Sequence, residues 1–220
     1  MAIFLLDSEL YFPDPELSEP NGLLALGGDL RPERLLLAYK MGIFPWYNEP
    51  NKILWWSPLE RCVFFPSHFH ESRSLKKILK KKNFQVTYNQ NYSDVVRFCA
   101  EIKRKDQEGT WILPEMIAAY EQLFILGYAH SVEVKKDGKW WGGLYGVQIG
   151  GVFFAESMFS AQKNGSKIAL SFLVKKVIKE GVGLIDCQLS NPHLLSLGAE
   201  EVARKRYLSL LQAAGKPLNP

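Results

Sequence analysis

The sequence has few cysteines and no long hydrophobic run, and both absences limit what the protein can be. Its three cysteines, Cys62, Cys99 and Cys187, are widely spaced and form no C-x-x-C pair, which disfavours a disulfide framework and a zinc knuckle. We expect small buried hydrophobic residues instead. No window approaches the roughly 20 apolar residues that cross a bilayer, and the start of the chain lacks the basic region and cleavage site of a secretory signal. These absences predict a cytoplasmic protein with no membrane segment.

Composition describes an ordinary globular chain with a slightly basic balance. Of its 220 residues, 47% are hydrophobic and 23% are charged, enough for one large domain with a small additional one. The net charge of +4 permits a polyanionic partner without requiring one. The position of the basic residues therefore matters more than their number.

A basic helix is predicted from Ser72 onward. Its apolar residues Leu75, Ile78 and Leu79 recur at helical spacing and fall on one face. The rest of the helix carries Arg73, Lys76, Lys77, Lys80 and Lys81. Such a run is usually a solvated face, but a phosphate backbone is its natural complement. Both interpretations stay open at this point.

One acidic residue, Glu156, lies inside an otherwise apolar stretch. Strand-forming residues before and after Gly150-Gly151 predict a hairpin that leads into this stretch. Because a buried lone charge is costly, Glu156 must have a structural partner or belong to a site.

Two further groups of residues are candidates for binding or catalysis. In the predicted strand 184–188, alternation places Asp186 and Gln188 on one face about 7 Å apart, and we expect them to bond to each other or to a ligand. Trp46 follows Pro45 in a loop, and Trp111 precedes a helix, so either ring is free to stack on a flat ligand. Trp55 and Trp56 are expected in the core.

The expected order of elements indicates an α/β or α+β fold with a mixed sheet. The expected elements are a strand at 84–88, a helix at 93–103, a helix from Pro114, a strand from His130, the hairpin, a helix at 166–180, the strand at 184–188 and a helix at 202–213. A hairpin before a long helix is the general layout of N-acetyltransferase-like domains, an analogy that concerns fold alone. The loop between them, residues 160–167, holds a single glycine, which disfavours coenzyme A as the acyl donor. We expect a small N-terminal α+β domain at 1–60 and the acetyltransferase-like domain at 61–220.

Nine short motifs resemble, in order, those of the leucyl/phenylalanyl-tRNA-protein transferase family. They are E-P-N-G-L-L-A-L-G-G-D-L, G-I-F-P-W, I-L-W-W-S-P, G-T-W-I, A-H-S-V-E-V, G-G-L-Y-G-V, F-A-E-S-M-F-S, L-I-D-C-Q and S-L-G-A, between residues 19 and 199. The resemblance implies an enzyme that moves leucine or phenylalanine from aminoacyl-tRNA to the N-terminal Arg or Lys of an acceptor protein. It implies that the product is marked for degradation by the N-end rule pathway. No metal, no cofactor and a monomeric protein are expected.

The resemblance also assigns roles to residues of this chain. Trp46 and Trp111 match aromatics that hold the terminal adenosine of the tRNA, and Glu156 matches the acid at the aminoacyl-adenosine site. Asp186 and Gln188 match a pair proposed to assist the attacking amine, with Asp186 bonded to the Gln188 NH2 group. Leu144, Phe153 and Met158 match the lining of the side-chain pocket. An apolar pocket of this kind also admits Met, because it separates similar side chains by only about 1–3 kcal/mol per methylene.

The pocket assignment has a geometric condition. Phe153 and Met158 have opposite strand parity, so both face one pocket only if a bulge or a strand end falls between them. We expect that irregularity close to Glu156. The chain also departs from the family at Gly165, commonly Ala, at Lys135, often Trp, and at Leu144, Met in some members. Two alternatives remain: an acetyl-coenzyme A dependent N-acetyltransferase, and a non-catalytic RNA-binding module.

Overall fold

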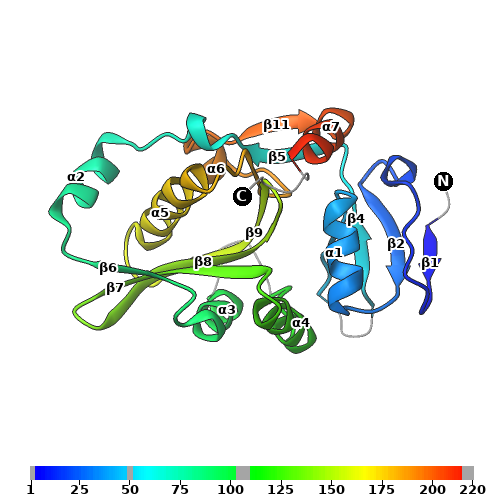
Figure 1. The fold of residues 1–220 in the computed structure, drawn as a ribbon, viewed down its shortest axis with the longest axis horizontal. Coiled ribbons are helices and arrows are strands. Elements are labelled where there is room, and N and C mark those ends of the chain that lie inside the picture. Colours follow the sequence, from blue (N-terminus) through cyan, green and yellow to red (C-terminus); the bar gives the residue numbers. More distant parts are fainter. Residues whose placement is uncertain (1–2, 49–51, 103–109, 215–220) are drawn as a thin grey trace.

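The computed structural model describes residues 3–48, 52–102 and 110–214, which form two sheets with helices packed against them (Figure 1). The N-terminal sheet has the order β1-β2-β4-β3 and is accompanied by helix α1 (Pro32–Lys40). Its strands are β1 (Phe4–Leu6), β2 (Leu23–Gly27), β3 (Phe44–Pro45) and β4 (Leu54–Trp56). Trp55 is fully buried there, as expected, and its Nε1 donates to the Gly27 carbonyl.

The larger sheet has seven strands in the order β11-β5-β10-β9-β8-β7-β6. Only β9 and β10 pair in parallel, and the other neighbours are antiparallel. The prediction of an α/β fold with a mixed sheet is therefore confirmed. The strands are β5 (Glu60–Phe64), β6 (Gln85–Tyr88), β7 (Ala129–Lys136), β8 (Lys139–Ile149), β9 (Val152–Ser160), β10 (Leu184–Asp186) and β11 (Glu200–Ala203).

Helices cover both faces of the large sheet and enclose two hydrophobic cores (Figure 1). Helix α5 (Gly165–Lys179) crosses one face, whereas α3 (Tyr92–Glu101) and α4 (Pro114–Ile125) cover the other. The basic helix α2 (Arg73–Lys81) packs near α5, and the short α6 (Pro192–Ser196) follows β10. None of the described helices is both long and apolar enough to cross a membrane.

The hairpin β8–β9 contains the predicted irregularity, and it falls at Glu156. Tyr145 pairs with Ser157 and Gly146 pairs with Ala155, so Glu156 is the extra residue of a β-bulge. This extra residue reverses the alternation of side chains between the two faces of β9, so residues of opposite parity on either side of Glu156 point to the same face. Phe153 and Met158 consequently face the same core, beneath α5, and the parity argument is confirmed.

Three predicted boundaries differ from the structure by two residues, and several others differ by one. Strand β10 ends at Asp186 rather than Gln188, because Gln188 has φ +57° and leaves the extended conformation. Helix α7 (Arg204–Ala214) begins two residues later than expected, because Val202 belongs to strand β11, which pairs with β5. Helix α3 ends at Glu101, and residue 103, where its end was expected, lies outside the described residues.

Helix α7 joins the two sheets. Its first residue, Arg204, is buried and donates to the Ser57 carbonyl at 2.8 Å and to the Ser18 hydroxyl. The side chains of Tyr207 and Leu208 lie against Gly42, where an added Cβ would come within 2.9 Å of each. Residues from both ends of the sequence thus meet at this helix.

Candidate active site

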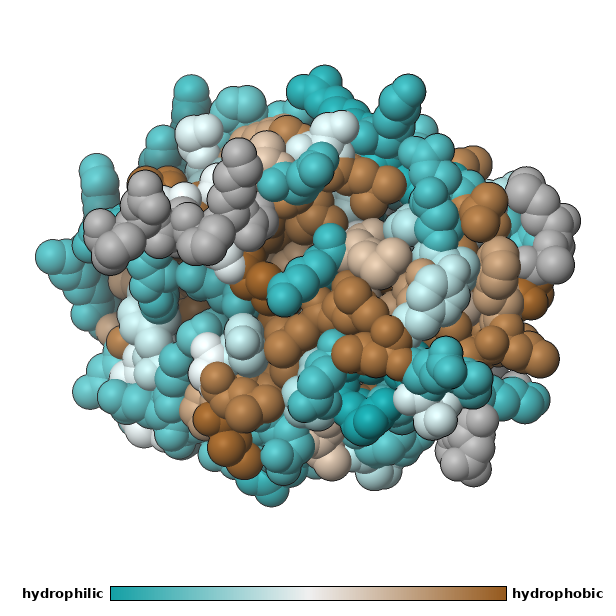
Figure 2. Space-filling view, turned by 45° about the vertical axis from the view of Figure 1, so that its right-hand side comes forward, coloured by the Kyte–Doolittle hydropathy of each residue, from teal (hydrophilic) through white to brown (hydrophobic). Residues whose placement is uncertain are grey.

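An apolar cavity of about 390 Å³ opens between the hairpin, α5 and the segment after β10. Its walls are Leu144, Ala155, Glu156, Ser157, Met158, Leu170, Cys187, Gln188, Leu189, Asn191 and Leu194. Leu144 and Met158, predicted from the sequence, pair directly across β8 and β9. The surface in Figure 2 carries a hollowed band of hydrophobic side chains bordered by hydrophilic ones.

Phe153 is not part of the wall of this cavity. The bulge places it on the expected face, but it is fully buried in the core and borders a separate small space near Val132 and Leu173. Strand β9 lines the cavity from Ala155 onward, and the role of Phe153 in the side-chain pocket stays a prediction. Leu170 and Leu194 supply apolar wall that the sequence analysis missed. Both lie on helical faces that look like ordinary core.

A second hollow of about 290 Å³ adjoins the first and is bordered by aromatic rings. Trp46 and Trp111 both line it, together with Phe44 and Pro45. Trp46 is held by Trp56, whose ring meets it edge-on at 5.7 Å and whose Nε1 donates to the Trp46 carbonyl at 2.6 Å. The two hollows share Glu156, Cys187, Gln188, Leu189 and Asn191 as common wall. One ligand can therefore occupy both.

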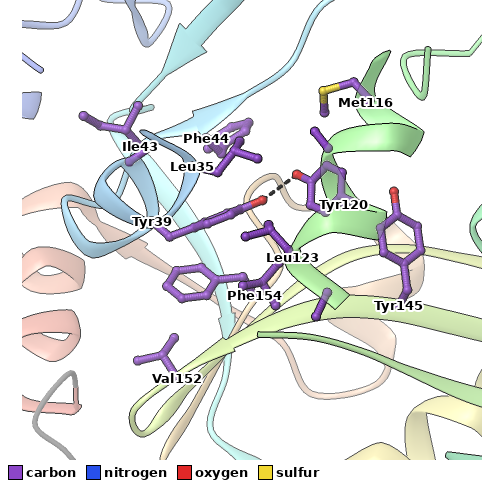
Figure 3. Close-up of a cluster of buried hydrophobic side chains, with 14 of the residues drawn as sticks. Leu35, Tyr39, Ile43, Phe44, Met116, Tyr120, Leu123, Tyr145, Val152 and Phe154 are labelled. Carbon is purple, nitrogen blue, oxygen red and sulfur yellow. Dashed lines mark hydrogen bonds between the residues drawn. The ribbon is translucent and has the colours of Figure 1, made fainter. Parts of the chain in front are cut away.

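Glu156 stands at this junction and is bound by two tyrosines from different elements. Tyr39 of α1 contacts its Oε1 at 2.8 Å, and Tyr120 of α4 contacts its Oε2 at 2.8 Å. The two hydroxyls also approach each other at 2.5 Å, and Figure 3 shows them pointing together. Burial raises the pKa of Glu156 to about 7, although the tyrosine hydroxyls act to lower that pKa.

Sequence reasoning missed both tyrosines. They lie 81 residues apart, and each sits at a helical position that fits a core residue. Both rings are fully buried, and desolvation raises the pKa of both phenols well above the ordinary value. The phenols therefore keep their protons.

Asp186 is a buried structural acceptor. Its side chain is fully buried and forms a two-bond pair with the guanidinium of Arg61, with Nε to Oδ1 and Nη2 to Oδ2 both at 2.8 Å. The Tyr207 hydroxyl donates to Oδ2 at 2.7 Å, and the backbone N–H of Gln188 donates to Oδ1 at 2.9 Å. The predicted bond from Asp186 to the Gln188 side chain is therefore wrong. Both carboxylate oxygens are already occupied by these donors.

The side chain of Gln188 turns toward the cavities because its backbone is left-handed. We assign its amide with NH2 facing the carbonyls of Ala155 at 3.0 Å and Cys187 at 3.1 Å, since the opposite assignment would place oxygen against oxygen. The Oε1 atom is then the remaining acceptor of this amide. Of the three cysteines, Cys62 and Cys99 are buried as expected, whereas Cys187 reaches the cavity wall.

Helix α2 presents its five predicted basic residues to solvent. Arg73, Lys76, Lys77, Lys80 and Lys81 are all exposed, while Leu75 anchors the helix in the core. Ser72 caps its first turn by accepting from the Leu75 N–H at 3.2 Å. The nearby Glu71 pairs with Lys175 of α5 at 2.8 Å, so its charge is directed to the protein rather than to the basic face.

The fold and the paired hollows define a mixed α/β protein with an apolar cavity beside a hollow bordered by aromatic rings. Comparison with known proteins identifies the family. The family description "Leucyl/phenylalanyl-tRNA protein transferase" matches residues 63–212, and that of its N-terminal domain matches residues 28–59. The chain belongs to the leucyl/phenylalanyl-tRNA-protein transferase family and is an enzyme.

Individual relatives agree over nearly the full chain. The leucyl/phenylalanyl-tRNA–protein transferase of Syntrophotalea carbinolica is 54% identical over 98% of this chain and 94% of its own length. That of Idiomarina loihiensis is 51% identical over 100% of this chain and 94% of its own. The family predicted from the nine motifs is therefore confirmed.

Solved structures are similar at a lower level. FemX has a TM-score of 0.49 at 10% identity, with 81% of this chain and 70% of that chain covered. A GCN5-related N-acetyltransferase from Kribbella flavida has a TM-score of 0.43 at 11% identity, with 81% and 63% covered.

Proposed function

We propose that the protein transfers a leucyl or phenylalanyl group from tRNA to the N-terminal Arg or Lys of an acceptor protein, at the junction of the two hollows. The product is an acceptor lengthened by one residue and marked for degradation by the N-end rule pathway. The observation that carries this proposal is the shared wall: a ligand that fills both hollows places the bond between its two parts beside Glu156 and Gln188. In an aminoacyl-adenosine, that bond is the ester.

Each hollow suits one part of the donor. The apolar cavity, with Leu144, Met158, Leu170 and Leu194, takes the side chain of the amino acid. Its volume of about 390 Å³ is ample for Leu, Met or Phe. The aromatic hollow takes the terminal adenine between Trp46 and Trp111, since base stacking on aromatic rings is worth about 1–3 kcal/mol per base.

The reaction requires alignment more than activation. An aminoacyl ester is already reactive, and a neutral α-amine is a good nucleophile, so holding both in place lowers much of the barrier. The Oε1 atom of Gln188 accepts an N–H of the attacking amine and aims its lone pair at the ester carbon. Asp186 acts indirectly: it accepts the Gln188 backbone N–H and so positions Gln188, without contacting the substrate itself.

The tRNA body lies along helix α2. Five exposed cations on one short helix complement a phosphate backbone. We further propose a division into domains at 1–60 and 61–220, since β4 and β5 belong to different sheets. We also propose that the enzyme acts as a monomer, and in the cytoplasm, which holds its tRNA donor.

A transfer assay tests the proposal directly. The protein is incubated with labelled Leu-tRNA and a peptide that begins with Arg, and labelled peptide is the expected result. A matched peptide with an acetylated N-terminus is the control, because it has no amine to attack. Binding of tRNA without labelled peptide would support the RNA-binding alternative, and tight coenzyme A binding without tRNA binding would support the acetyltransferase alternative.

The occupancy of the two hollows has its own test. Trp46→Ala and Trp111→Ala should each weaken binding of Leu-tRNA by about tenfold or more, from the lost stacking. Trp140→Ala is the comparison, since this partly buried ring lies on β8 against Phe98 and Phe159 and outside both hollows. Equal effects of all three substitutions would contradict the assignment of the adenine to the aromatic hollow.

A further inference from the structure

The cluster of Glu156, Tyr39 and Tyr120 contains one more close contact than its hydroxyl protons can serve. The three groups form a closed triangle of oxygen contacts, at 2.8, 2.8 and 2.5 Å. Every contact at these distances needs a hydrogen between the two oxygens. Each phenol has one proton to donate. Two phenols therefore supply two of the three hydrogens.

An ionised Glu156 does not fit this triangle. If both phenols donate to the carboxylate, the contact of 2.5 Å between Tyr39 and Tyr120 joins two oxygens with no hydrogen between them. If one phenol donates to the other, a contact of 2.8 Å to the carboxylate loses its hydrogen instead. Each arrangement leaves two acceptors facing each other, which is repulsive at these distances.

A protonated Glu156 completes the triangle. The carboxylic acid donates to one phenol, that phenol donates to the second, and the second donates to the other carboxyl oxygen. We propose that Glu156 works as a neutral carboxylic acid, closed into a ring of three hydrogen bonds by Tyr39 and Tyr120. Tyr39 and Tyr120 are the positioning residues that hold the neutral form.

Another acid of the same sheet shows the contrast. Glu133 on β7 is fully buried and also receives hydroxyl groups, from Ser131 at 2.5 Å and Thr87 at 2.5 Å, with the Asn91 N–H at 3.4 Å. Each of these donors brings its own hydrogen, so an ionised Glu133 is satisfied. The requirement for an additional proton is specific to the geometry around Glu156.

The surroundings of Glu156 act on its charge from several elements. Tyr39 of α1 and Tyr120 of α4 contact it. Tyr145 of β8 packs against Tyr120, and Tyr92 of α3 packs against Tyr145. Asp186 of β10 and Arg61 of β5 lie on the remaining side. Asp186 disfavours a second negative charge here, whereas Arg61 favours it. Because Arg61 is already paired with Asp186 at 2.8 Å, little of its charge is left for Glu156.

Neutrality suits the reaction, and this step rests on the proposed function. When the amine attacks the ester, negative charge develops on the carbonyl oxygen. A carboxylate at the junction of the hollows would oppose that charge, and it would also repel the phosphates of the tRNA. A neutral acid, with its proton held inside the ring, removes this repulsion and keeps only acceptor lone pairs toward the bound donor.

Infrared spectroscopy tests the protonation without reference to activity. The wild-type protein should show the C=O stretching band of a protonated carboxylic acid at about pH 6, a condition under which ordinary Asp and Glu side chains are ionised. Glu156→Gln should remove this band, and the control Glu133→Gln should leave it in place. Absence of the band, or its persistence in Glu156→Gln, would overturn the inference.

Glu156→Gln also tests the role of Glu156 in the reaction, because a glutamine at this position can form the same ring of hydrogen bonds with Tyr39 and Tyr120. Its NH2 group donates to one phenol and its oxygen accepts from the other, so three hydrogen bonds are retained. Glu156→Gln should keep more transfer activity than Glu156→Ala, which opens the ring and should fall below Glu156→Gln by about tenfold or more. The ratio of wild-type to Glu156→Gln activity should fall as pH rises above about 7, with titration of the acceptor amine cancelling in that ratio.

These outcomes separate this inference from the proposed function. A wild-type enzyme that labels the Arg peptide while Glu156→Gln does not would show that the carboxylate form is needed, and would overturn the neutral-acid role alone. A wild-type protein that shows the acid band but labels no peptide would contradict the proposed function and leave the proton assignment standing.

Discussion

Removing the carboxylate of Asp186 should mainly lower the free energy of unfolding. Its effect on the reaction should be indirect. Asp186→Ala leaves the guanidinium of Arg61, whose side chain is 1% exposed, buried without its carboxylate. It also removes the acceptors of the Tyr207 hydroxyl and the Gln188 N–H. Breaking a buried ion pair on one side costs about 3–5 kcal/mol. With a urea slope of about 2 kcal/mol per M, the unfolding midpoint should fall by about 2 M.

Two further variants give this prediction its controls. Gln188→Ala keeps the backbone N–H that reaches Asp186, so its urea midpoint should stay near that of wild type while peptide labelling falls. The double variant Arg61→Met with Asp186→Leu replaces the ion pair by apolar side chains and should recover most of the lost stability. Urea titrations followed by tryptophan fluorescence measure all the midpoints.

One result would refute this reasoning. If Asp186→Ala unfolded at the wild-type urea concentration and bound Leu-tRNA normally but failed to label the peptide, Asp186 would act directly in the chemistry. The supporting role given to it here would then be wrong.

Three further predictions concern the other parts of the site. Replacing Lys76, Lys77 and Lys80 by Glu should weaken tRNA binding and reduce the slope of log affinity against log salt concentration by up to about 0.7–0.9 per lost phosphate contact. The control Lys205→Glu, on α7, should change neither the affinity nor the slope. An unchanged slope in the triple variant would mean that helix α2 is only a solvated face. Leu144→Ala enlarges the apolar cavity and should shift the preference from Leu toward Phe by about 1–3 kcal/mol in competition between the two charged tRNAs, and an unshifted ratio would remove Leu144 from the pocket. The pKa of Glu156 is raised from 4.5 to about 7 in the folded protein, so as pH rises the unfolded chain ionises first. The free energy of unfolding of wild type should therefore fall relative to that of Glu156→Gln between about pH 4.5 and about pH 7, and the difference should stay constant above that range. Chemical denaturation over this pH range checks the sign.

Local patterns in the sequence were enough for the longer helices, the hairpin and one unusual detail, but not for strands β1, β2, β5 and β11. The spacing of Leu75, Ile78 and Leu79 identifies helix α2, and the glycine pair identifies the hairpin. The bulge at Glu156 follows from parity, because Phe153 and Met158 could share a face only through an extra residue. A strand alternates its side chains regularly, so a residue pair that breaks this alternation reveals the bulge.

Long-range partners were beyond the reach of these patterns. Arg61 and Asp186 lie 125 residues apart, and Tyr39 and Tyr120 lie 81 apart. Alternation along a strand correctly predicts the face of Asp186 but says nothing about which neighbouring strand supplies its donor. The left-handed backbone of Gln188 was equally hidden, since few residues other than Gly, Asn and Asp adopt it.

Helix α7 has a consequence for the timing of synthesis. The chain is synthesised from its N-terminus, so Trp46, Arg61 and Glu156 emerge well before Arg204 and Tyr207. Until that helix docks, Arg204 cannot bind Ser57, and the Asp186 carboxylate lacks the Tyr207 hydroxyl. These contacts to Ser57 and Asp186 therefore form only after residues 204–207 have been synthesised.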